Sequence, residues 1–287
     1  MTADPTTIVI ATRDRRRELA RTLEHLLALP ERPRVTVVDN GSRDGTADLV
    51  ARRFPGVDLI RLGRNHGSAA RNLGVRAART PYVAFSDDDS WWEPGALRRA
   101  ADLLDAHPRL ALISAATLVG PGRDPDPLNA VLAGSPLPAR PELPGTPVLG
   151  FLACASIVRR EAFLQARGFH PLLFFAGEET LLALDLRTHG WELCHVPSVR
   201  ALHHPSTSRP SRGRLALEQR NALLTAWLRR PLRTAARGTA RLAAAALHDP
   251  EARTALAGLL RRLPAALRER RPLPAHLEDQ ARLLENR

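Results

Sequence analysis

The sequence predicts an α/β protein in which a mostly parallel sheet carries helices on both faces, followed by an all-helical C-terminal appendage. Strand-like and helix-like patterns alternate from the N-terminus, which is typical of βαβ units. Three of the early strand-like runs end in polar or acidic residues. From residue 215 the composition changes to Ala, Leu and Arg with helical spacing. We therefore divide the chain into a domain at 1–214 and an appendage at 215–287.

The first half of the chain contains four strand-like runs, each short and rich in β-branched or aromatic residues. These predicted strands cover residues 6–11, 34–38, 57–62 and 82–85. A helix with leucines on one face is expected at 15–29, and further helices are expected after residues 44, 68 and 94. The order strand, helix, strand favours parallel pairing of neighbouring strands.

The second half of the domain is less regular. Strands are predicted at residues 109–119, 148–158 and 191–196, and helices at 160–166 and from 178 to 188. Residues 120–147 are rich in Pro, Gly and Asp, which predicts a long loop near a pocket mouth. A loop rich in Ser, Pro and Arg leads to residue 214. The appendage is expected to be helical, with breaks at four prolines, Pro231, Pro250, Pro264 and Pro272.

The charge of the chain is strongly basic. Its 287 residues carry a formal net charge of +12, and the pI is about 11.4. Every basic residue is Arg, and outside the C-terminal third the arginines are scattered, which indicates compositional bias rather than a nucleic-acid footprint. We expect no nucleic-acid partner, and we expect an anionic partner of another kind, either a nucleotide diphosphate or a membrane surface.

The cysteine spacing and the hydropathy of the chain predict where in the cell the protein is found. Cys154 and Cys194 show no zinc-type spacing, and no signal-peptide pattern or apolar run of membrane-spanning length occurs. These features predict a cytoplasmic protein. Peripheral contact of the Arg-rich appendage with the inner face of the membrane is an alternative to simple packing on the domain.

The most informative stretch is the acidic end of the fourth strand, Tyr82 to Asp89. Three consecutive carboxylates raise one another's pKa unless a positive group or a cation neutralises them. A divalent ion with oxygen ligands would do so, and a solvated acidic loop is the alternative.

Two other strands also end in polar residues. The strand-end pairs are Thr12 with Arg13, Asp39 with Asn40, and Asp87 with Asp89. In open α/β sheets, ligands bind outside the carboxyl ends of the strands, so these pairs predict one pocket. Neither the dinucleotide-binding fingerprint nor a P-loop is present at these turns.

Taken together, these motifs resemble family 2 glycosyltransferases with the GT-A fold, a Rossmann-like architecture. The resemblance covers residues 6–204 and rests on V-V-D-N-G-S-R-D-G-T at 37–46, N-H-G-S-A-A-R-N-L-G at 65–74, Y-V-A-F-S-D-D-D at 82–89, a Glu pair and a late His pair. It implies metal-assisted, inverting transfer of a hexosyl or deoxyhexosyl group. The donor would be a nucleotide-diphosphate sugar, and the acceptor an unidentified hydroxyl, lipid-linked or in a cell-envelope or natural-product glycan.

The resemblance also implies roles for single residues. Thr12, Arg13, Asp39 and Asn40 would hold the nucleoside. Asp87 would approach the ribose or the sugar. Asp89 would hold Mg²⁺ or Mn²⁺ against the diphosphate, where the ion neutralises the leaving group.

The acceptor's general base corresponds to Glu179, with Glu178 as runner-up. Their place at a helix N-terminus favours the ionised form, and two capping-turn glutamates without chemistry are the alternative. The family usually has Glu-Asp here, then an acid and a basic residue, where this chain has Leu181 and Asp185. That departure leaves acceptor recognition open.

Four further residues have two interpretations each. His203 or His204 would complete the metal or diphosphate site, and we favour His204. Arg71 would pair with a strand-end acid or a phosphate, structural pairing being favoured. Asp88 would face solvent or the sugar. Trp91 would stack on a sugar or belong to the core.

Two other functions compete with glycosyl transfer. A nucleotidyltransferase would also use strand-end acids for a metal, but it would want a Gly-rich first loop with Lys, and this chain has T-R-D-R-R-R there. A non-catalytic binder of sugar nucleotides is compatible with the departures at Leu181 and Asp185.

Overall fold

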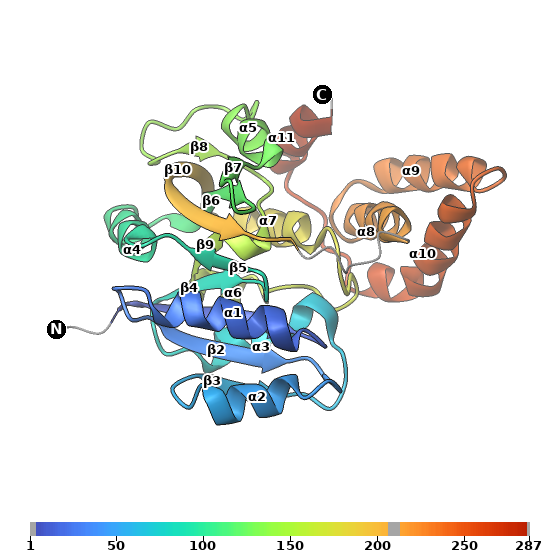
Figure 1. The fold of residues 1–287 in the computed structure, drawn as a ribbon. Coiled ribbons are helices and arrows are strands. Elements are labelled where there is room, and N and C mark those ends of the chain that lie inside the picture. Colours follow the sequence, from blue (N-terminus) through green and yellow to red (C-terminus); the bar gives the residue numbers. More distant parts are fainter. Residues whose placement is uncertain (1–3, 206–212, 286–287) are drawn as a thin grey trace.

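A computed structural model describes residues 4–205 and 213–285 of the chain (Figure 1). Most of the predicted Ser/Pro/Arg loop before residue 214 therefore lies outside the described residues. The strands are β1 (Thr6–Thr12), β2 (Arg34–Asp39), β3 (Asp58–Arg61), β4 (Tyr82–Ser86), β5 (Ser90–Trp92), β6 (Leu110–Val119), β7 (Asp124–Pro125), β8 (Thr146–Pro147), β9 (Ser156–Arg159) and β10 (Glu192–His203). The domain helices are α1 (Arg16–Leu27), α2 (Thr46–Arg53), α3 (Arg71–Ala77), α4 (Ala96–Ala106), α5 (Pro127–Ala133), α6 (Arg160–Gln165) and α7 (Glu178–Thr188).

One sheet organises the domain, with the strand order β3-β2-β1-β4-β9-β6-β10-β5. The pairs β3–β2, β2–β1 and β1–β4 are parallel, and so is β6–β10, whereas β9 and β5 run antiparallel to their neighbours. The predicted α/β class with flanking helices is therefore confirmed, while the sheet as a whole is mixed and only its β3-β2-β1-β4 part is wholly parallel.

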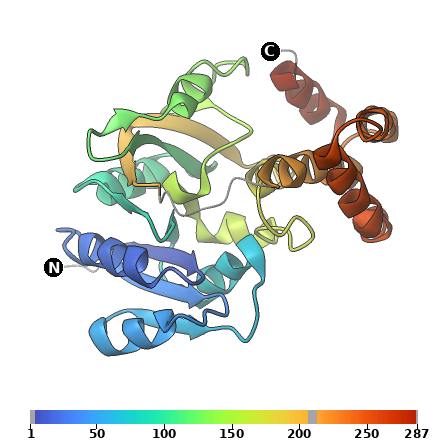
Figure 2. The ribbon, with the colours of Figure 1, turned by 45° about the vertical axis from the view of Figure 1, so that its right-hand side comes forward.

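The alternation of side chains along β1 separates the two helical layers. Ile8 and Ile10 belong to a core shared with α1, α2 and α4, whereas Val9 belongs to a second core shared with α3, α6 and α7. Successive side chains of a strand point to opposite faces, so a fully apolar strand must be covered on both sides. Figures 1 and 2 show these layers on either side of the blue and cyan strands.

The second half of the sheet differs from the prediction in three places. Residues 148–155 are not a strand: β9 begins only at Ser156, after a 3-10 turn at Ala153–Ala155. The predicted long loop at 120–147 contains β7, α5 and β8. The predicted strand at 191–196 continues, past a bulge, to His203 as β10. Apolar runs do not reveal strand ends, because an irregular buried segment has the same composition.

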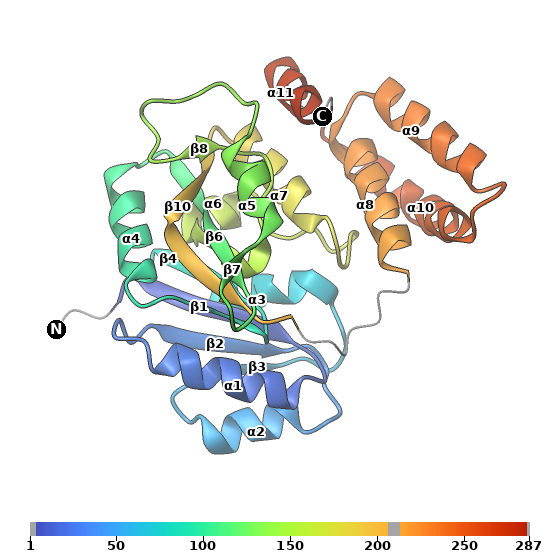
Figure 3. The same ribbon diagram turned by 45° about the horizontal axis from the view of Figure 1, so that its top comes forward.

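The appendage contains four helices, α8 (Arg214–Arg229), α9 (Leu232–Ala245), α10 (Pro250–Arg268) and α11 (Ala275–Glu285). Leucines and alanines of α8, α9 and α10 form a core that also includes Leu173 and Leu181 of the domain. Figure 3 shows these three helices beside the sheet domain, with α11 returning toward α5 and α7. The expected break at Pro264 is wrong, because α10 runs through it with Leu259 and Ala266 buried on either side. The domain boundary at residue 214 stays a prediction.

No helix among residues 4–205 and 213–285 combines the length and apolarity needed to cross a bilayer.

Candidate active site

The ends of β1, β2 and β4 meet at one edge of the sheet. Thr12 pairs in register with Asp39, and Ile10 pairs with Ser86, the residue before the acidic triplet. The parallel register thus brings residues from three distant parts of the sequence side by side, as predicted for a ligand site at the carboxyl ends of the strands.

The middle acid of the triplet is part of the scaffold. Asp88 is 3% exposed, accepts a hydrogen bond from Thr12 Oγ1 (3.0 Å) and lies 3.4 Å from Arg15 Nε. Its carbonyl accepts from Thr22 Oγ1 at 2.8 Å. Asp88 therefore faces β1 and α1 rather than solvent or a sugar, and Arg15, which sequence reasoning missed, neutralises it. The only hint was the run of arginines after the first strand.

Asp89 lies between two positive or protonatable groups. Its carboxylate oxygens are 3.7 Å from Arg15 Nη2 and 3.5 Å from His203 Nε2. Burial disfavours protonation of His203, but the hydrogen bond and charge of Asp89 outweigh it, so the pKa of His203 is raised. Of the two candidate histidines, His203 turns its ring nitrogen to Asp89, whereas His204 stacks on Trp91 with ring centroids 4.5 Å apart.

Arg71 connects the strand-end acids to α7. It is 7% exposed and forms an ion pair with Asp87. Burial opposes its charge, but Asp87 and the glutamates Glu178 and Glu179 raise its pKa overall. The structural pairing favoured for Arg71 is therefore present, and it shows that Glu178 and Glu179 share one electrostatic environment with Asp87.

The two glutamates open α7 after Gly177, whose φ of +79° is in the left-handed region. Burial raises the pKa of Glu178, against the lowering effect of the Arg71 charge. Burial and the neighbouring charge of Glu178 raise the pKa of Glu179 to about 8. A carboxylate whose pKa lies near neutrality is suited to take a proton, because the ionised base then has a strong affinity for it.

The loop before α7 is fastened by the appendage. Asn221 of α8 is fully buried, and its Nδ2 donates to three carbonyls, those of Leu173 (2.9 Å), Phe175 (2.7 Å) and Ala176 (2.5 Å). Arg220 Nη2 donates to Leu173 O as well, at 2.9 Å. These two polar residues lie within a Leu/Ala-rich helix, and its sequence pattern did not reveal their contacts with the loop.

The loop is also held from the side of α3. Ser68 N donates to Phe174 O at 2.6 Å, and a Cβ on Gly67 would come within 2.0 Å of that carbonyl. Only glycine permits this approach, which gives the N-H-G-S motif a physical reason. Asn40 contributes from β2: its side chain donates to Gly67 O (3.0 Å) and accepts from His66 N (2.7 Å).

Two predicted ligand residues lie at the edge of this cluster. Asp39 is 4% exposed and accepts from Ser42 N at 3.4 Å, while Arg13 is exposed and pairs with Asp14 at 3.4 Å. Trp91 is buried and stacks on His25 as well as His204, with centroids 4.1 Å apart in the first pair. This packing corresponds to the core interpretation of Trp91.

The family model "Glycosyl transferase family 2" matches residues 7–165, more than half of the chain. The chain belongs to glycosyl transferase family 2. It is therefore a glycosyltransferase, and the alternatives of a nucleotidyltransferase and of a non-catalytic binder do not hold.

Relatives of this glycosyltransferase include a named rhamnosyltransferase and a succinoglycan biosynthesis protein. It is 31% identical to the N-acetylglucosaminyl-diphospho-decaprenol L-rhamnosyltransferase of Mycobacterium tuberculosis, over 77% of this chain and 85% of that protein. A shorter match, 40% identical over 35% of this chain and 30% of the relative, is to the succinoglycan biosynthesis protein ExoO of Rhizobium meliloti.

Solved glycosyltransferases share the fold. The S. aureus TarS 1-349 complex with UDP-GlcNAc aligns with a TM-score of 0.59 at 17% identity, covering 90% of this chain and 72% of that one. The mannosyltransferase PcManGT from Pyrobaculum calidifontis, in complex with GDP-Man and Mn²⁺, aligns with a TM-score of 0.56 at 20% identity, covering 99% and 87%. These matches confirm the predicted GT-A fold.

The glycosyltransferase offers few groups of its own to a divalent cation. Among the described residues no three His, Cys, Asp or Glu side chains gather in a metal-binding arrangement. Asp89 and His203 are one carboxylate and one imidazole within 3.5 Å of each other. Carboxylate and imidazole suit Mn²⁺, and a bound diphosphate with water would supply the remaining oxygens. The donor set therefore fits an ion that binds together with the nucleotide.

Proposed function

We propose that this glycosyltransferase moves a rhamnosyl or another hexosyl group from a nucleotide-diphosphate sugar to a hydroxyl of a lipid-linked diphosphate acceptor, with inversion. The named activity of the mycobacterial relative, which matches most of both chains, supports this substrate class. Cell-envelope glycan synthesis is the corresponding biological context.

One observation carries the mechanism: the glutamates that open α7 share a buried environment with the Arg71–Asp87 pair at the sheet edge. Glu179 is the proposed general base and accepts the proton of the acceptor hydroxyl. The hydroxyl oxygen forms a bond to the anomeric carbon as the bond from that carbon to the phosphate oxygen breaks. The nucleotide diphosphate leaves with the electron pair, and a single displacement inverts the configuration.

The remaining residues hold the donor. Thr12, Arg13 and Asp39 at the ends of β1 and β2 are proposed to contact the nucleoside, with Asp87 near the sugar. Asp89 and His203 would hold Mg²⁺ or Mn²⁺. When bound, such an ion supplies positive charge to the departing diphosphate. Glu178, adjacent to Arg71, is proposed to raise the pKa of Glu179 rather than to take the proton itself.

A cytoplasmic location with peripheral membrane contact remains our proposal. Arg233, Arg237 and Arg241 recur every fourth residue on α9 and are exposed, which places them on one face of that helix. Exposed Leu232 and Leu247 lie near its two ends. Arginines with interspersed leucines favour an anionic bilayer surface. Flotation with phosphatidylglycerol vesicles tests this, and an Arg237→Glu variant that floats as well as wild type would contradict it.

The proposed reaction is tested with purified protein, Mn²⁺ and a panel of UDP-, GDP- and dTDP-linked sugars. The wild type should release nucleotide diphosphate from one donor, faster with a prenyl-diphosphate-linked acceptor. Asp89→Ala should lose metal-dependent nucleotide binding, and Glu179→Ala should keep binding but lose turnover by about 10²- to 10⁴-fold. No thermal shift with any nucleotide diphosphate plus metal would overturn the proposal.

A further inference from the structure

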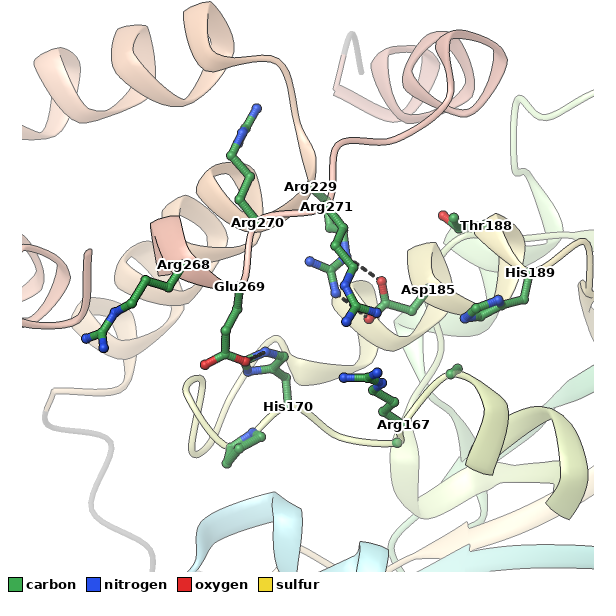
Figure 4. Close-up of a pocket in the computed structure, with 13 residues that line it drawn as sticks. Arg167, His170, Asp185, Thr188, His189, Arg229, Arg268, Glu269, Arg270 and Arg271 are labelled. Atoms are coloured by element: carbon green, nitrogen blue, oxygen red, sulfur yellow. Dashed lines mark hydrogen bonds and ion pairs between the residues drawn. The ribbon is translucent and has the colours of Figure 1, made fainter. Parts of the chain in front are cut away.

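A concave site lies between the domain and the appendage. A pocket of about 300 Å³ is enclosed by the loop after α6, the second half of α7, the end of α8 and the segment after α10. None of the residues assigned to sugar transfer lines it. Figure 4 shows side chains from these four segments around one space.

The walls of this pocket are strongly positive. Five arginines and two acids line it. Asp185 forms an ion pair with Arg229, with Nη2 to Oδ2 at 2.9 Å, and Glu269 lies 3.2 Å from His170 Nε2. Within the described parts of the chain, no ion pair joins Arg167 or Arg271 to an acid. An anion is the simplest group to neutralise them.

The arginines do not all contribute equally. In Figure 4, Arg167, Arg229 and Arg271 point toward Asp185, whereas Arg268 and Arg270 turn away from it. Arg270 donates instead to main-chain carbonyls, including Arg230 O at 2.5 Å. Three guanidinium groups and one carboxylate leave a net charge of about +2 at the centre, which matches a phosphate or diphosphate group.

The guanidinium of Arg229 is held in a fixed orientation and keeps N–H groups free to donate to a ligand. Arg229 is 6% exposed and held by both oxygens of Asp185, and its Nη1 donates to Leu228 O at 3.0 Å. A guanidinium has five N–H bonds, so these contacts leave two for a ligand. Its orientation is thus fixed before anything binds, which lowers the entropic cost of binding.

Arg167 has a left-handed backbone conformation, which is strained for a residue with a side chain. Its φ is +65°, directly after the C-cap residue of α6, where glycine is the usual residue. The next residue is Gly168, with φ +69°. An arginine at such a position, exposed and aimed into a basic pocket, indicates a use for its charge.

We infer that this pocket binds a phosphate or diphosphate group through Arg167, Arg229 and Arg271. The inference rests on the proposed function for its source, since the acceptor class proposed above carries a diphosphate. Asp185 and the proposed base Glu179 are six residues apart on α7, a rise of about 9 Å. The pocket and the proposed base therefore lie within two turns of one helix.

Binding is measured directly, by titrating inorganic pyrophosphate into the full chain with EDTA present and no nucleotide. The wild type should bind, and Arg271→Ala and Arg167→Gly should each weaken binding by about tenfold or more. Arg268→Ala, a lining arginine turned away, is the matched control and should stay within twofold. Arg167→Gly should not lower the melting temperature, because glycine relieves the left-handed strain.

Geranyl diphosphate identifies the source. Tighter binding than pyrophosphate supports a lipid-linked diphosphate, and equal binding supports a free anion, with the pocket confirmed either way. No pyrophosphate binding by the wild type, or equal loss in Arg268→Ala, overturns the pocket. A protein that binds pyrophosphate there but transfers no sugar overturns only the proposed function. Normal transfer with unchanged pyrophosphate affinity in Arg167→Gly overturns only the pocket.

Discussion

The contact between α8 and the loop before α7 makes Asn221 a positioning residue for the proposed base. Its Nδ2 is shared by three carbonyls of residues 173–176. Phe174 and Ala176 in that loop have φ values of +67° and +70°. Two non-glycine residues in the left-handed region cost about 2–4 kcal/mol together, and Asn221 helps to keep them there.

Asn221→Ala removes both N–H donors of the amide. Leaving buried acceptors without partners costs about 1–3 kcal/mol each, so the loss of two hydrogen bonds, about 2–6 kcal/mol, is comparable with the strain that they oppose. The loop should then relax and move Glu179. Since Ser68 and Arg220 still hold two of its carbonyls, we expect displacement rather than unfolding.

The assay is steady-state transfer with donor and acceptor varied in turn. We expect kcat to fall by about 10²-fold or more, toward the loss of a general base, with the donor KM little changed because Thr12 and Asp39 lie on other elements. The pH profile should lose its rising limb. Thr225→Ala is the matched control, because this buried hydroxyl one turn later on α8 has no hydrogen-bond partner among the described residues. A kcat within threefold of wild type in Asn221→Ala, with lowered stability, would refute the reasoning.

Three further predictions concern charge. Burial and the charge of Glu178 raise the pKa of Glu179 to about 8. Because a general base must be ionised, kcat/KM should rise about tenfold per pH unit below pH 8 and then level off. Glu179→Gln should abolish this rise, and a flat wild-type profile from about pH 6 to 8 would count against Glu179. Because of this raised pKa, the folded state binds more protons than the unfolded state between the ordinary carboxyl pKa of 4.5 and about 8. The contribution of Glu179 to the free energy of unfolding therefore falls as pH rises from 4.5 to about 8. Glu179→Gln should therefore gain stability relative to wild type with rising pH, and a constant difference in urea unfolding would contradict this sign. Arg15→Ala should lower the free energy of unfolding by about 3–5 kcal/mol, because it removes a positive charge beside the buried carboxylates of Asp88 and Asp89. Arg13→Ala breaks an exposed ion pair and should lower it by less than about 1 kcal/mol. Equal losses in chemical denaturation would show that Asp88 does not depend on Arg15.

Several features of the active-site edge were readable from local patterns. Short apolar runs that end in Thr12, Asp39 and Asp87 predicted strands whose carboxyl ends carry ligand groups, and the strand register brings those ends together. Parallel strands joined by helices place their carboxyl ends on one edge, so order along the chain was sufficient.

Other features depended on contacts that sequence patterns do not encode. Asp88 and Asp89 are neighbours in an acidic triplet, yet Asp88 is held by Thr12 from 76 residues away and Asp89 lies beside His203. His203, the last residue of β10, faces Asp89, whereas His204 beyond the strand stacks on Trp91, and the apolar pattern did not show where that strand ends.

By itself, the sequence determined the alternating strands and helices, the sheet edge where the site lies and the motifs of the family, because these depend on residues close together along the chain. Only the tertiary structure decided which acids are neutralised internally, why the pKa of Glu179 is raised, and that Asn221 holds the loop before the proposed base. Those properties depend on burial and on charges brought together from distant segments, and both arise only when the chain is packed.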